Sequence, residues 1–212
     1  MRLLLLRHGE TPWSTEHRYQ GVSDTPLSDL GRAQVAALAE RLRDEPLTEL
    51  RSSPLRRTLD TAAAVASYHE APLVADEHLR EICLGRWEGL SHEEIKRLAP
   101  ERYAGWLTDP GKTMPPEGEA MEAVMRRVGD LWREMAARPR DATVALVGHG
   151  ACLRALLCLA LEVPTAAFWR FQLGAASVSE LYVHGRGAKL VLLNDLHHLN
   201  GSGTPPPGDL PF

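Results

Sequence analysis

Short apolar runs alternate with amphipathic segments along most of the chain. Residues 3–6 are four consecutive leucines, and residues 143–147 form a second, mostly apolar run. Runs of this length are typical of strands that are buried on both faces of a parallel sheet. Between the two runs, residues 28–44 and 53–67 carry apolar side chains at the three- and four-residue spacing of a helix with one buried face. This alternation predicts strands that are linked by helices.

The remaining elements follow the same alternation, apart from a helical stretch in the middle of the chain. Further strands are predicted at 50–52, 73–75, 178–184 and 188–193, and further helices at 119–137 and 150–161. The stretch from about residue 88 to residue 137 is helical throughout and looks like an insertion. We therefore expect an α/β fold: a three-layer sandwich with a mostly parallel sheet, helices on both faces and a helical insertion over the functional site.

Turn and cap residues predict where several elements begin and end. Ser53-Pro54 predicts the start of a helix, because serine is a preferred N-cap and proline suits the first helical position. Gly185-Arg186-Gly187 predicts a hairpin between the last two strands. We expect residues 1–198 to form a single domain and residues 199–212, which are rich in glycine and proline, to form a flexible tail.

Composition narrows the class of protein. The chain has 212 residues, of which 44% are hydrophobic and 25% charged, as is usual for one globular domain. These values exclude wholesale disorder, a collagen-like repeat and a polytopic membrane protein. The net charge is −4, and binding of nucleic acid along a surface needs many uncompensated basic residues. We therefore expect no nucleic-acid partner, while a local basic pocket remains compatible with the composition.

The cysteines and the amino end indicate a cytoplasmic protein. Cys83, Cys152 and Cys158 are an odd number without CxxC spacing, which argues against a disulfide framework and a zinc ribbon. Reduced thiols are typical of the cytoplasm. The apolar run at residues 3–6 is shorter than the core of an export signal, and no stretch approaches the roughly 20 apolar residues of a membrane span. We expect no membrane association, and the sequence predicts no particular oligomeric state.

Three groups of polar residues follow predicted strands. They are Arg7-His8-Gly9 after the first strand, Gly148-His149-Gly150 after the run at 143–147, and Ser53 to Arg57 after a third strand. In an open α/β sheet, ligands bind beyond the carboxyl ends of the strands. The glycines let the backbone approach a ligand, and Gly150 opens a helix whose amino end favours an anion. If the strands are neighbours, these groups meet in one anion-binding pocket.

The sequence resembles the histidine phosphatase superfamily, also called phosphoglycerate mutase-like, over nearly the whole chain to about residue 198. The resemblance rests on four motifs in the family's order: Arg7-His8-Gly9-Glu10, Ser53-Pro54-Leu55-x-Arg57-x-x-x-Thr61, Leu79-Arg80-Glu81-x-x-x-Gly85-x-Trp87-Glu88-Gly89 and Gly148-His149-Gly150. It implies that His8 is the nucleophile, that Arg7, Arg57 and His149 bind the phosphoryl group, and that Glu81 is the proton donor.

These roles agree with elementary chemistry. A neutral imidazole attacks phosphorus and forms a phosphohistidine that water then hydrolyses. The charges of Arg7 and Arg57 disfavour protonated His8, match phosphate oxygens in bidentate geometry and stabilise the transition state. Glu81 has to hold a proton for the leaving group, which the negative charge of a bound phosphate favours. Because the arginines supply the positive charge, we expect neither a metal nor a cofactor.

Two further residues are candidates at the substrate. Ser14 stands where the family commonly has an asparagine whose amide helps to hold the phosphoryl group. A serine hydroxyl is shorter and donates one hydrogen bond, so we expect Ser14 to hold the phosphoryl group less firmly. Gln20 either borders the substrate or serves its own loop, and the sequence favours neither role.

The resemblance is greatest to the alpha-ribazole phosphatase and broad-specificity phosphatase branch, through Glu10-Thr11 and residues 24–28. It implies a metal-independent phosphomonoester hydrolase that acts on a small phosphorylated metabolite, for example alpha-ribazole phosphate. A phosphoglycerate mutase is the first alternative, although the segment from residue 95 to residue 119 is short for a mutase. A catalytically silent scaffold on the same fold is the second, and the intact set of motif residues argues against it.

Overall fold

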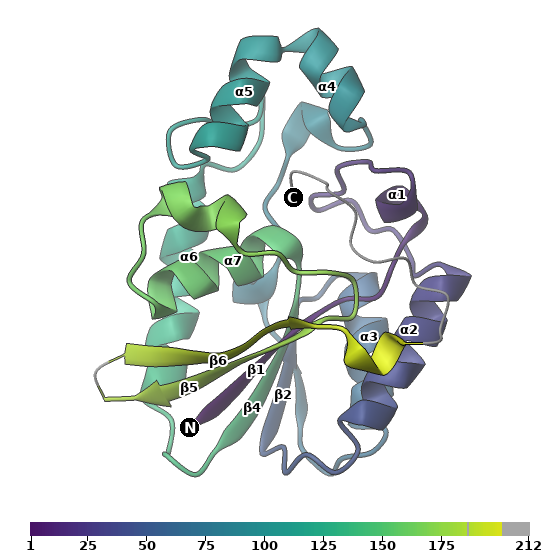
Figure 1. The fold of residues 1–212 in the computed structure, drawn as a ribbon, viewed down its shortest axis with the longest axis vertical. Coiled ribbons are helices and arrows are strands. Elements are labelled where there is room, and N and C mark those ends of the chain that lie inside the picture. The colour runs from purple at the N-terminus through teal and green to yellow at the C-terminus, as the bar shows by residue number, and fades with distance from the viewer. Residues whose placement is uncertain (186, 201–212) are drawn as a thin grey trace.

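A six-stranded mixed sheet forms the centre of the molecule (Figure 1). The computed structural model describes residues 1–185 and 187–200. The strands are β1 Arg2–Arg7, β2 Glu49–Ser52, β3 Leu73–Ala75, β4 Thr143–Gly148, β5 Val178–His184 and β6 Gly187–Asp195. Their order across the sheet is β3-β2-β4-β1-β5-β6. The strands β1 to β4 are parallel to one another, and β5 runs antiparallel to both of its neighbours, β1 and β6. The predicted mostly parallel sheet is confirmed.

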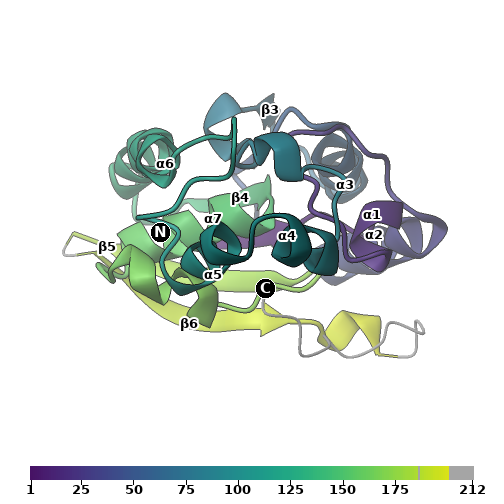
Figure 2. The same cartoon turned by 90° about the horizontal axis from the view of Figure 1, so that it is seen from above.

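Helices cover both faces of this sheet (Figures 1 and 2). The α-helices are α1 Pro12–Thr15, α2 Asp29–Arg41, α3 Arg56–Ala66, α4 His92–Leu98, α5 Pro100–Thr108, α6 Met121–Ala136 and α7 Gly150–Ala160. The short 3-10 helices are η1 Glu77–Leu79, η2 Gly85–Trp87, η3 Thr165–Arg170 and η4 His197–Leu199. None of the helices in the described ranges combines the length and the apolar character that a bilayer span requires.

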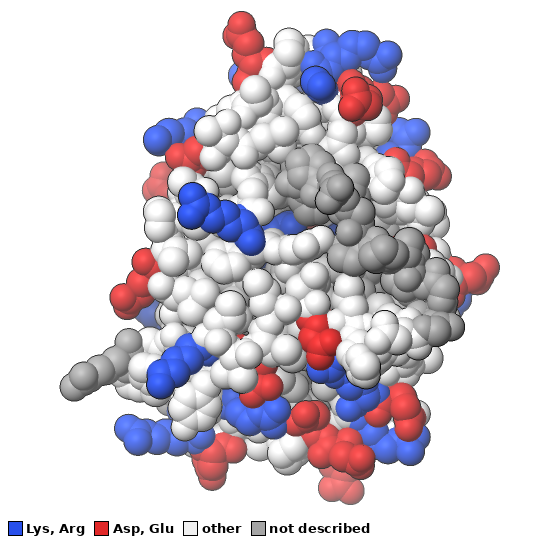
Figure 3. All heavy atoms as spheres, in the orientation of Figure 1, with Lys and Arg blue, Asp and Glu red and all other residues white. Residues whose placement is uncertain are grey.

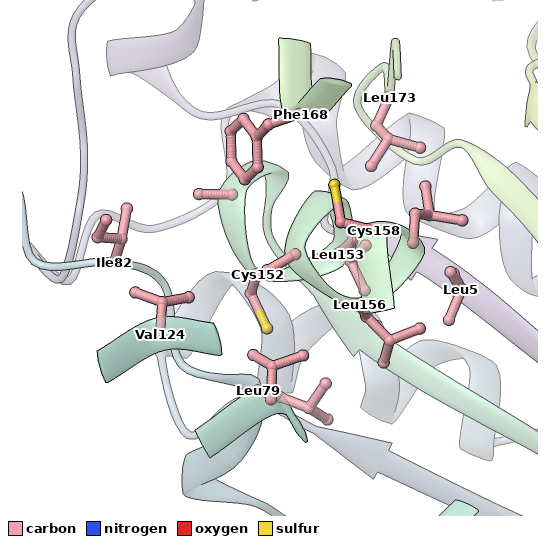
Figure 4. Packing of buried hydrophobic residues seen from close by; sticks show 14 of the residues in the cluster. Leu5, Leu79, Ile82, Val124, Cys152, Leu153, Leu156, Cys158, Phe168 and Leu173 are labelled. Atoms are coloured by element: carbon pink, nitrogen blue, oxygen red, sulfur yellow. The ribbon is translucent and has the colours of Figure 1, made fainter. Parts of the chain in front are cut away.

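Alternation along β1 divides the core into two apolar clusters. Leu3 and Leu5 pack with residues of α6 and α7, whereas Leu4 and Leu6 pack with residues of α2 and α3. Successive side chains of a strand point to opposite faces, so a strand of continuous leucines is needed where both faces are covered. Figure 4 shows the first cluster, in which the side chains of α7 fill the space below Phe168.

The register of the central strands brings the histidine motifs together. In the parallel pair of β1 and β4, Arg7 lies opposite Gly148. The next residues are His8 and His149, and the His8 N–H donates to the Gly148 carbonyl at 3.1 Å. Two residues that are far apart in the chain are therefore neighbours because the sheet sets their positions, independently of any ligand.

The predicted helical insertion divides into two parts. The helices α4 and α5 lie beyond the end of the sheet, at the top of Figure 1. The helix α6 instead lies against α7, and Val128 and Leu131 of α6 are fully buried in the same cluster as Leu3. An amphipathic helix of this length has enough apolar surface to join the core. Only the first part of residues 88–137 is thus placed as a roof.

The short helix η4 packs against the second apolar cluster. Leu199 belongs to η4 and is buried in the second cluster, one residue beyond the expected end at 198. The rest of the expected tail, residues 201–212, lies outside the described residues, as does Arg186 in the predicted hairpin. The two strands that this hairpin joins, β5 and β6, pair antiparallel as expected.

The start of α3 differs from its prediction. The helix begins at Arg56, three residues after the predicted cap, and its N-cap is Leu55, without a side-chain hydrogen bond. Asp24, from a distant loop, accepts a hydrogen bond from the Arg56 N–H at 2.7 Å and so satisfies one of the free donors of the first turn. The expectation that Ser53 caps the helix was wrong because the Ser53 hydroxyl contacts His149 instead.

A buried ionic cluster joins β2 to η1 and α6. The guanidinium of Arg51, which is only 9% exposed, contacts the carboxylates of Glu49, Asp76 and Glu134. Burial alone would raise the pKa of Asp76, but hydrogen bonds from His78 and Arg51 outweigh it and lower this pKa. Asp76 is therefore held in the charged form beside Arg51, while Glu49 and Glu134 are shared between Arg51 and Arg138.

We expect Arg51→Ala to lower the free energy of unfolding by about 3 kcal/mol, because it leaves the buried Asp76 carboxylate without its arginine partner. Urea denaturation of both proteins would measure this change. Arg133→Ala is the matched control: Arg133 pairs with Asp130 on the surface, where an ion pair contributes less than about 1 kcal/mol. Equal effects of the two substitutions would contradict a structural role for the Arg51 cluster.

Candidate active site

A pocket of about 150 Å³ lies at the carboxyl ends of β1, β2 and β4. Its wall combines basic, aromatic and aliphatic side chains, together with a single carboxylate. The residues include Arg7, His8, Ser14, His17, Arg18, Tyr19, Gln20, Gly21, Arg57, Glu81, Ile82, Leu84, His92, Trp106, Gly150, Ala151, Arg154 and Trp169. The structure therefore brings most of the predicted site residues to one cavity, at the edge of the sheet where ligands bind in α/β folds.

The His8 imidazole is held with one nitrogen available. Its Nδ1 lies 2.7 Å from the Gly9 carbonyl oxygen, which only accepts hydrogen bonds, so Nδ1 carries the ring proton. The neutral ring then has its lone pair on Nε2. Burial lowers the pKa of His8 well below its usual value, and the positive charges of Arg57 and Arg7 lower it further. His8 is thus kept neutral, which is the state that a nucleophilic imidazole requires.

His149 faces His8 from the neighbouring strand. The two ring centroids are 5.1 Å apart. The Nε2 of His149 lies 2.7 Å from the Ser53 hydroxyl, which also accepts a hydrogen bond from the Leu55 N–H. When the hydroxyl proton points to Nε2, Nδ1 carries the ring proton. This buried Nδ1 has no hydrogen-bond partner among the described residues, so it is a free donor to a ligand between the two rings.

Two arginines supply positive charge beside His8. Arg57, 1% exposed, donates to the carbonyls of Gly21 and Ser23 at 2.8 Å each. Arg7 donates to the Leu173 carbonyl. Burial lowers the pKa of both arginines, that of Arg57 to about 10, which leaves Arg57 charged at neutral pH. The buried Nε atoms of both have no partner in the described part of the chain, and unsatisfied buried donors of this kind are costly unless a ligand binds them.

The loop at residues 21–23, whose carbonyls accept the hydrogen bonds of Arg57, has a conformation that requires glycine at position 21. Gly21 has a φ of +54°, and a β-carbon there would lie 2.2 Å from a Glu88 carboxylate oxygen. That carboxylate accepts hydrogen bonds from the N–H groups of Val22 and Ser23 at 3.0 Å. Glu88 is thus an anchor of the loop.

Glu81 lies at the amino end of α7. One carboxylate oxygen accepts a hydrogen bond from the Ala151 N–H and the other from the Cys152 N–H, each at 3.0 Å. The sequence predicts that this helix end faces a bound anion, and the structure shows that its second and third N–H groups bind Glu81. The Gly150 N–H makes no hydrogen bond among the described residues, so the first N–H of α7 remains available for a phosphoryl oxygen.

Ser14 and Gln20 differ in what they offer the pocket. The Ser14 hydroxyl donates to the Thr11 carbonyl and accepts from the Thr11 N–H, both at 2.8 Å, in a capping box at α1. The one hydroxyl proton of Ser14 is therefore donated to Thr11 and not to the pocket. The Gln20 Oε1 accepts hydrogen bonds from the hydroxyls of Thr11 and Thr25. The oxygen end of the amide is fixed by these contacts, and the nitrogen end makes no hydrogen bond among residues 1–185 and 187–200, so it can donate to a ligand.

Ser53 and Arg154 are among the site residues that the sequence does not predict. The sequence favours Ser53 as a helix cap, whereas the structure places its hydroxyl on His149. Arg154 lies outside the sequence motifs, although it is the only charged residue in the apolar helix α7. An isolated charge in a fully apolar helix is the signal that could have identified it, because such a group is buried only where something compensates it.

Aromatic side chains form the far wall of the pocket. Tyr19, Trp106 and Trp169 line it, and the Trp169 indole N–H donates to the Trp106 carbonyl at 3.0 Å. Trp106 belongs to α5 of the roof and Trp169 to η3. The end of the pocket near His8 is thus polar, and the opposite end combines aromatic rings with the guanidinium of Arg154. Among the described residues, no group of three or more His, Cys, Asp or Glu side chains is arranged to hold a metal ion.

Comparison with known proteins identifies the family. The model of the histidine phosphatase superfamily (branch 1) matches residues 3–196. Phosphoserine phosphatase 1 of Hydrogenobacter thermophilus is 34% identical over 199 residues, which cover 94% of each chain. The adenosylcobalamin/alpha-ribazole phosphatase of Salmonella typhimurium is 31% identical over 92% of this chain and 96% of its own. The resemblance inferred from the sequence motifs is confirmed.

A solved structure agrees with this relationship. A mycobacterial glucosyl-3-phosphoglycerate phosphatase, solved in complex with VO3, superposes with a TM-score of 0.83 and 35% sequence identity. The match covers 91% of this chain and 98% of the mycobacterial one.

Proposed function

The chain belongs to the histidine phosphatase superfamily and is a phosphomonoester hydrolase; on this premise, we propose that it hydrolyses small phosphorylated metabolites through a phosphohistidine on His8. One observation carries the proposal. The rings of His8 and His149 face each other at 5.1 Å, and three buried nitrogens around them have no partner among the described residues. A phosphoryl group between the rings would satisfy these donors, which belong to Arg7, Arg57 and His149.

In the first step, His8 Nε2 attacks phosphorus and the bond from phosphorus to the ester oxygen breaks. The electron pair of this bond leaves with the oxygen, which takes a proton from the carboxyl group of Glu81. The charges of Arg7 and Arg57 stabilise the phosphoryl oxygens, and the His149 Nδ1–H donates to one of them. The products are the alcohol and a phosphohistidine, with Glu81 left as a carboxylate.

In the second step, water takes the place of the alcohol. The Glu81 carboxylate accepts a proton as the water oxygen attacks phosphorus, and the bond from Nε2 to phosphorus breaks. Inorganic phosphate leaves, and His8 returns to the neutral form that its surroundings favour. Backbone N–H groups of α7 stabilise the Glu81 carboxylate between the two steps.

Glu81→Gln is expected to lower kcat on an alkyl phosphate by about 10²- to 10³-fold, because glutamine has no proton to give to the leaving oxygen. Activity on p-nitrophenyl phosphate should fall much less, since nitrophenolate leaves without protonation. Phosphate release from both substrates would measure the difference. Glu77→Gln, at an exposed carboxylate near in sequence, is the control. Equal losses on both substrates would contradict the proton-donor role.

The direct test of the proposal is phosphate release from p-nitrophenyl phosphate in a chelating buffer. We expect turnover without added metal, because arginines supply the positive charge. Absence of turnover from about pH 5 to pH 8, the range in which histidine titrates, would instead favour a catalytically silent protein. Isomerisation of 3-phosphoglycerate that is faster than phosphate release would favour the mutase alternative.

We propose a small molecule as the partner of this pocket and the cytoplasm as its compartment. The cavity admits a small organic phosphate, and acidic and basic side chains are interspersed around the face shown in Figure 3, which gives nucleic acid no continuous basic track there. The cysteines at 83, 152 and 158 are free, which fits a reducing compartment. Alpha-ribazole phosphate and phosphoserine, named for two relatives, are the first substrates to test.

A further inference from the structure

Arg127 and Glu119 form an ion pair that is largely withdrawn from solvent, and the mechanism proposed above does not use it. The Nε and Nη2 atoms of Arg127 donate to the two carboxylate oxygens of Glu119 at 3.0 and 3.2 Å. The two side chains are 20% and 22% exposed, whereas those of the neighbouring pair, Arg126 and Glu122, are 70% and 85% exposed. A planar pair with two hydrogen bonds has a fixed geometry and can hold a neighbouring segment in place.

The segment that carries Glu81 is bound to this ion pair at both ends. On one side of Glu81, the Nη1 atom of Arg127 donates to the His78 carbonyl at 2.8 Å. On the other side, the Cys83 N–H donates to the Glu119 carboxylate at 3.4 Å, and the Glu119 N–H donates to the Cys83 carbonyl at 2.8 Å. The pair therefore contacts the backbone before and after Glu81.

This segment, residues 78–83, packs against α6 and α7. Leu79 and Ile82 are buried in the first apolar cluster, and Figure 4 shows them near Val124 of α6 and Cys152 of α7. Because buried backbone groups need hydrogen-bond partners, a segment in this position requires donors and acceptors from its neighbours. The ion pair supplies them at both ends of the segment.

The Glu81 side chain depends on the placement of its backbone. No side chain within residues 1–185 and 187–200 forms a hydrogen bond with its carboxylate, whose partners are the backbone N–H groups of Ala151, Cys152 and Ile82. Glu81 thus keeps its position only while its own segment and α7 keep theirs. A displacement of about 1 Å at a reacting group can lower a rate about 100-fold.

Arg127 carries its charge at neutral pH, as an ion pair requires. Burial alone would lower the pKa of Arg127. The hydrogen bonds with Glu119, followed by nearby negative charges that include Glu81, outweigh burial and raise this pKa above its ordinary value. The attraction between Arg127 and Glu119 is therefore present throughout the pH range in which a histidine nucleophile works.

We propose that Arg127 and Glu119 are positioning residues of the reaction: their ion pair holds residues 78–83 so that the Glu81 carboxyl group reaches the oxygen of the leaving group. This inference rests on the proposed function, in which Glu81 is the proton donor. Neither Arg127 nor Glu119 belongs to the pocket lining, so both act through the position of Glu81 and not by contact with the substrate.

The test uses two aryl esters that differ in their need for an acid. Phenyl phosphate and p-nitrophenyl phosphate have the same ring, but nitrophenolate leaves without protonation and phenolate leaves far less readily. We expect Arg127→Met to lower kcat/KM for phenyl phosphate by about 10-fold and to change that for p-nitrophenyl phosphate little, since a displaced acid loses part of its contribution. Phosphate release by one protein sample measures both values, and their ratio does not depend on the fraction of the sample that is folded.

A second readout connects Arg127 with Glu81. In a Glu81→Gln background no carboxyl proton has to be positioned, so Arg127→Met should have little further effect on kcat/KM for phenyl phosphate. Glu119→Gln removes one charge of the pair and nearly keeps the shape of the side chain. It should show the same dependence on the ester with a smaller loss, and it provides the test if Arg127→Met does not fold.

Two further variants serve as controls. Arg126→Met changes the preceding arginine of α6, which pairs with Glu122 at the surface, and should hydrolyse both esters as the wild type does. Arg127→Lys keeps the charge without the planar fork of donors, so it should retain part of the rate for phenyl phosphate that Arg127→Met loses.

Several results would overturn the inference while leaving the phosphatase intact. Equal losses on both esters in Arg127→Met and Glu119→Gln would assign the pair to the fold alone. Wild-type kcat/KM for phenyl phosphate in both variants would show that Glu81 is held without the pair. Losses that multiply when Arg127→Met and Glu81→Gln are combined would show that the two residues act independently. A wild type that releases no phosphate from p-nitrophenyl phosphate would instead remove the proposed function itself.

Discussion

Replacing His8 by alanine is expected to lower phosphate release by about 10⁴-fold or more. The variant has no second nucleophile, because the nearest imidazole, His149, has its Nε2 on the Ser53 hydroxyl and its Nδ1 protonated. The residual rate should be that of a pocket that binds phosphate without forming a covalent intermediate. Steady-state kinetics on p-nitrophenyl phosphate would measure the loss, and quenching with labelled substrate would show the absence of an acid-labile phosphoryl group on the protein.

His69→Ala is the matched control, since His69 follows the far end of α3 and lies outside the pocket lining. This variant should keep both activity and the acid-labile label. A His8→Ala protein that still forms the label would show that another residue is the nucleophile. Near-wild-type thermal unfolding of His8→Ala is needed for the comparison, and we expect it because the removed ring makes one local hydrogen bond, to Gly9.

Arg57→Met is expected to lower kcat by about 10³-fold, the size of effect that a single transition-state arginine has in phosphoryl transfer. KM should rise as well, because Arg57 also holds the carbonyls of Gly21 and Ser23. The substitution also removes a positive charge that acts on His8. The charge of Arg57 lowers the pKa of His8, so the variant should have a higher His8 pKa, with the acid limb of kcat/KM moved to higher pH.

Arg56→Met is the control for this experiment, because Arg56 is adjacent in sequence and its side chain is 67% exposed. We expect Arg56→Met to retain the rate and the pH profile of the wild type. Similar losses in the two variants would mean that the positive charge of the α3 amino end as a whole, rather than the guanidinium of Arg57, supports the reaction.

The strands themselves, and the edge of the sheet at which the two histidines lie, are the parts that sequence patterns predict well. A short, continuously apolar run between polar residues is stable as a strand that is covered on both faces. Both β1 and β4 are strands of this kind. Each run ends in a motif of histidine and glycine. Parallel neighbours place such motifs at one edge, so the meeting of His8 and His149 follows from local patterns together with one topological rule.

Contacts between distant segments were less predictable, for a physical reason. A serine before proline and a helix satisfies the statistics of an N-cap, and nothing local shows that Asp24 caps the helix instead. Similarly, the hydroxyl of Ser14 is short enough to close a capping box with Thr11, so its hydrogen-bonding capacity is used within its own turn. Local propensity describes what a residue can do, and tertiary packing selects among these options.

The segment between η3 and β5, residues 171–177, positions two arginines of the pocket. The Phe171 carbonyl holds Arg154 and the Leu173 carbonyl holds Arg7, so two arginines of the pocket depend on one short piece of backbone. Insertions or substitutions there would displace both together. Changes in this segment should therefore alter substrate binding and rate at the same time, and variants that broaden substrate range without loss of rate should carry their changes elsewhere in the wall.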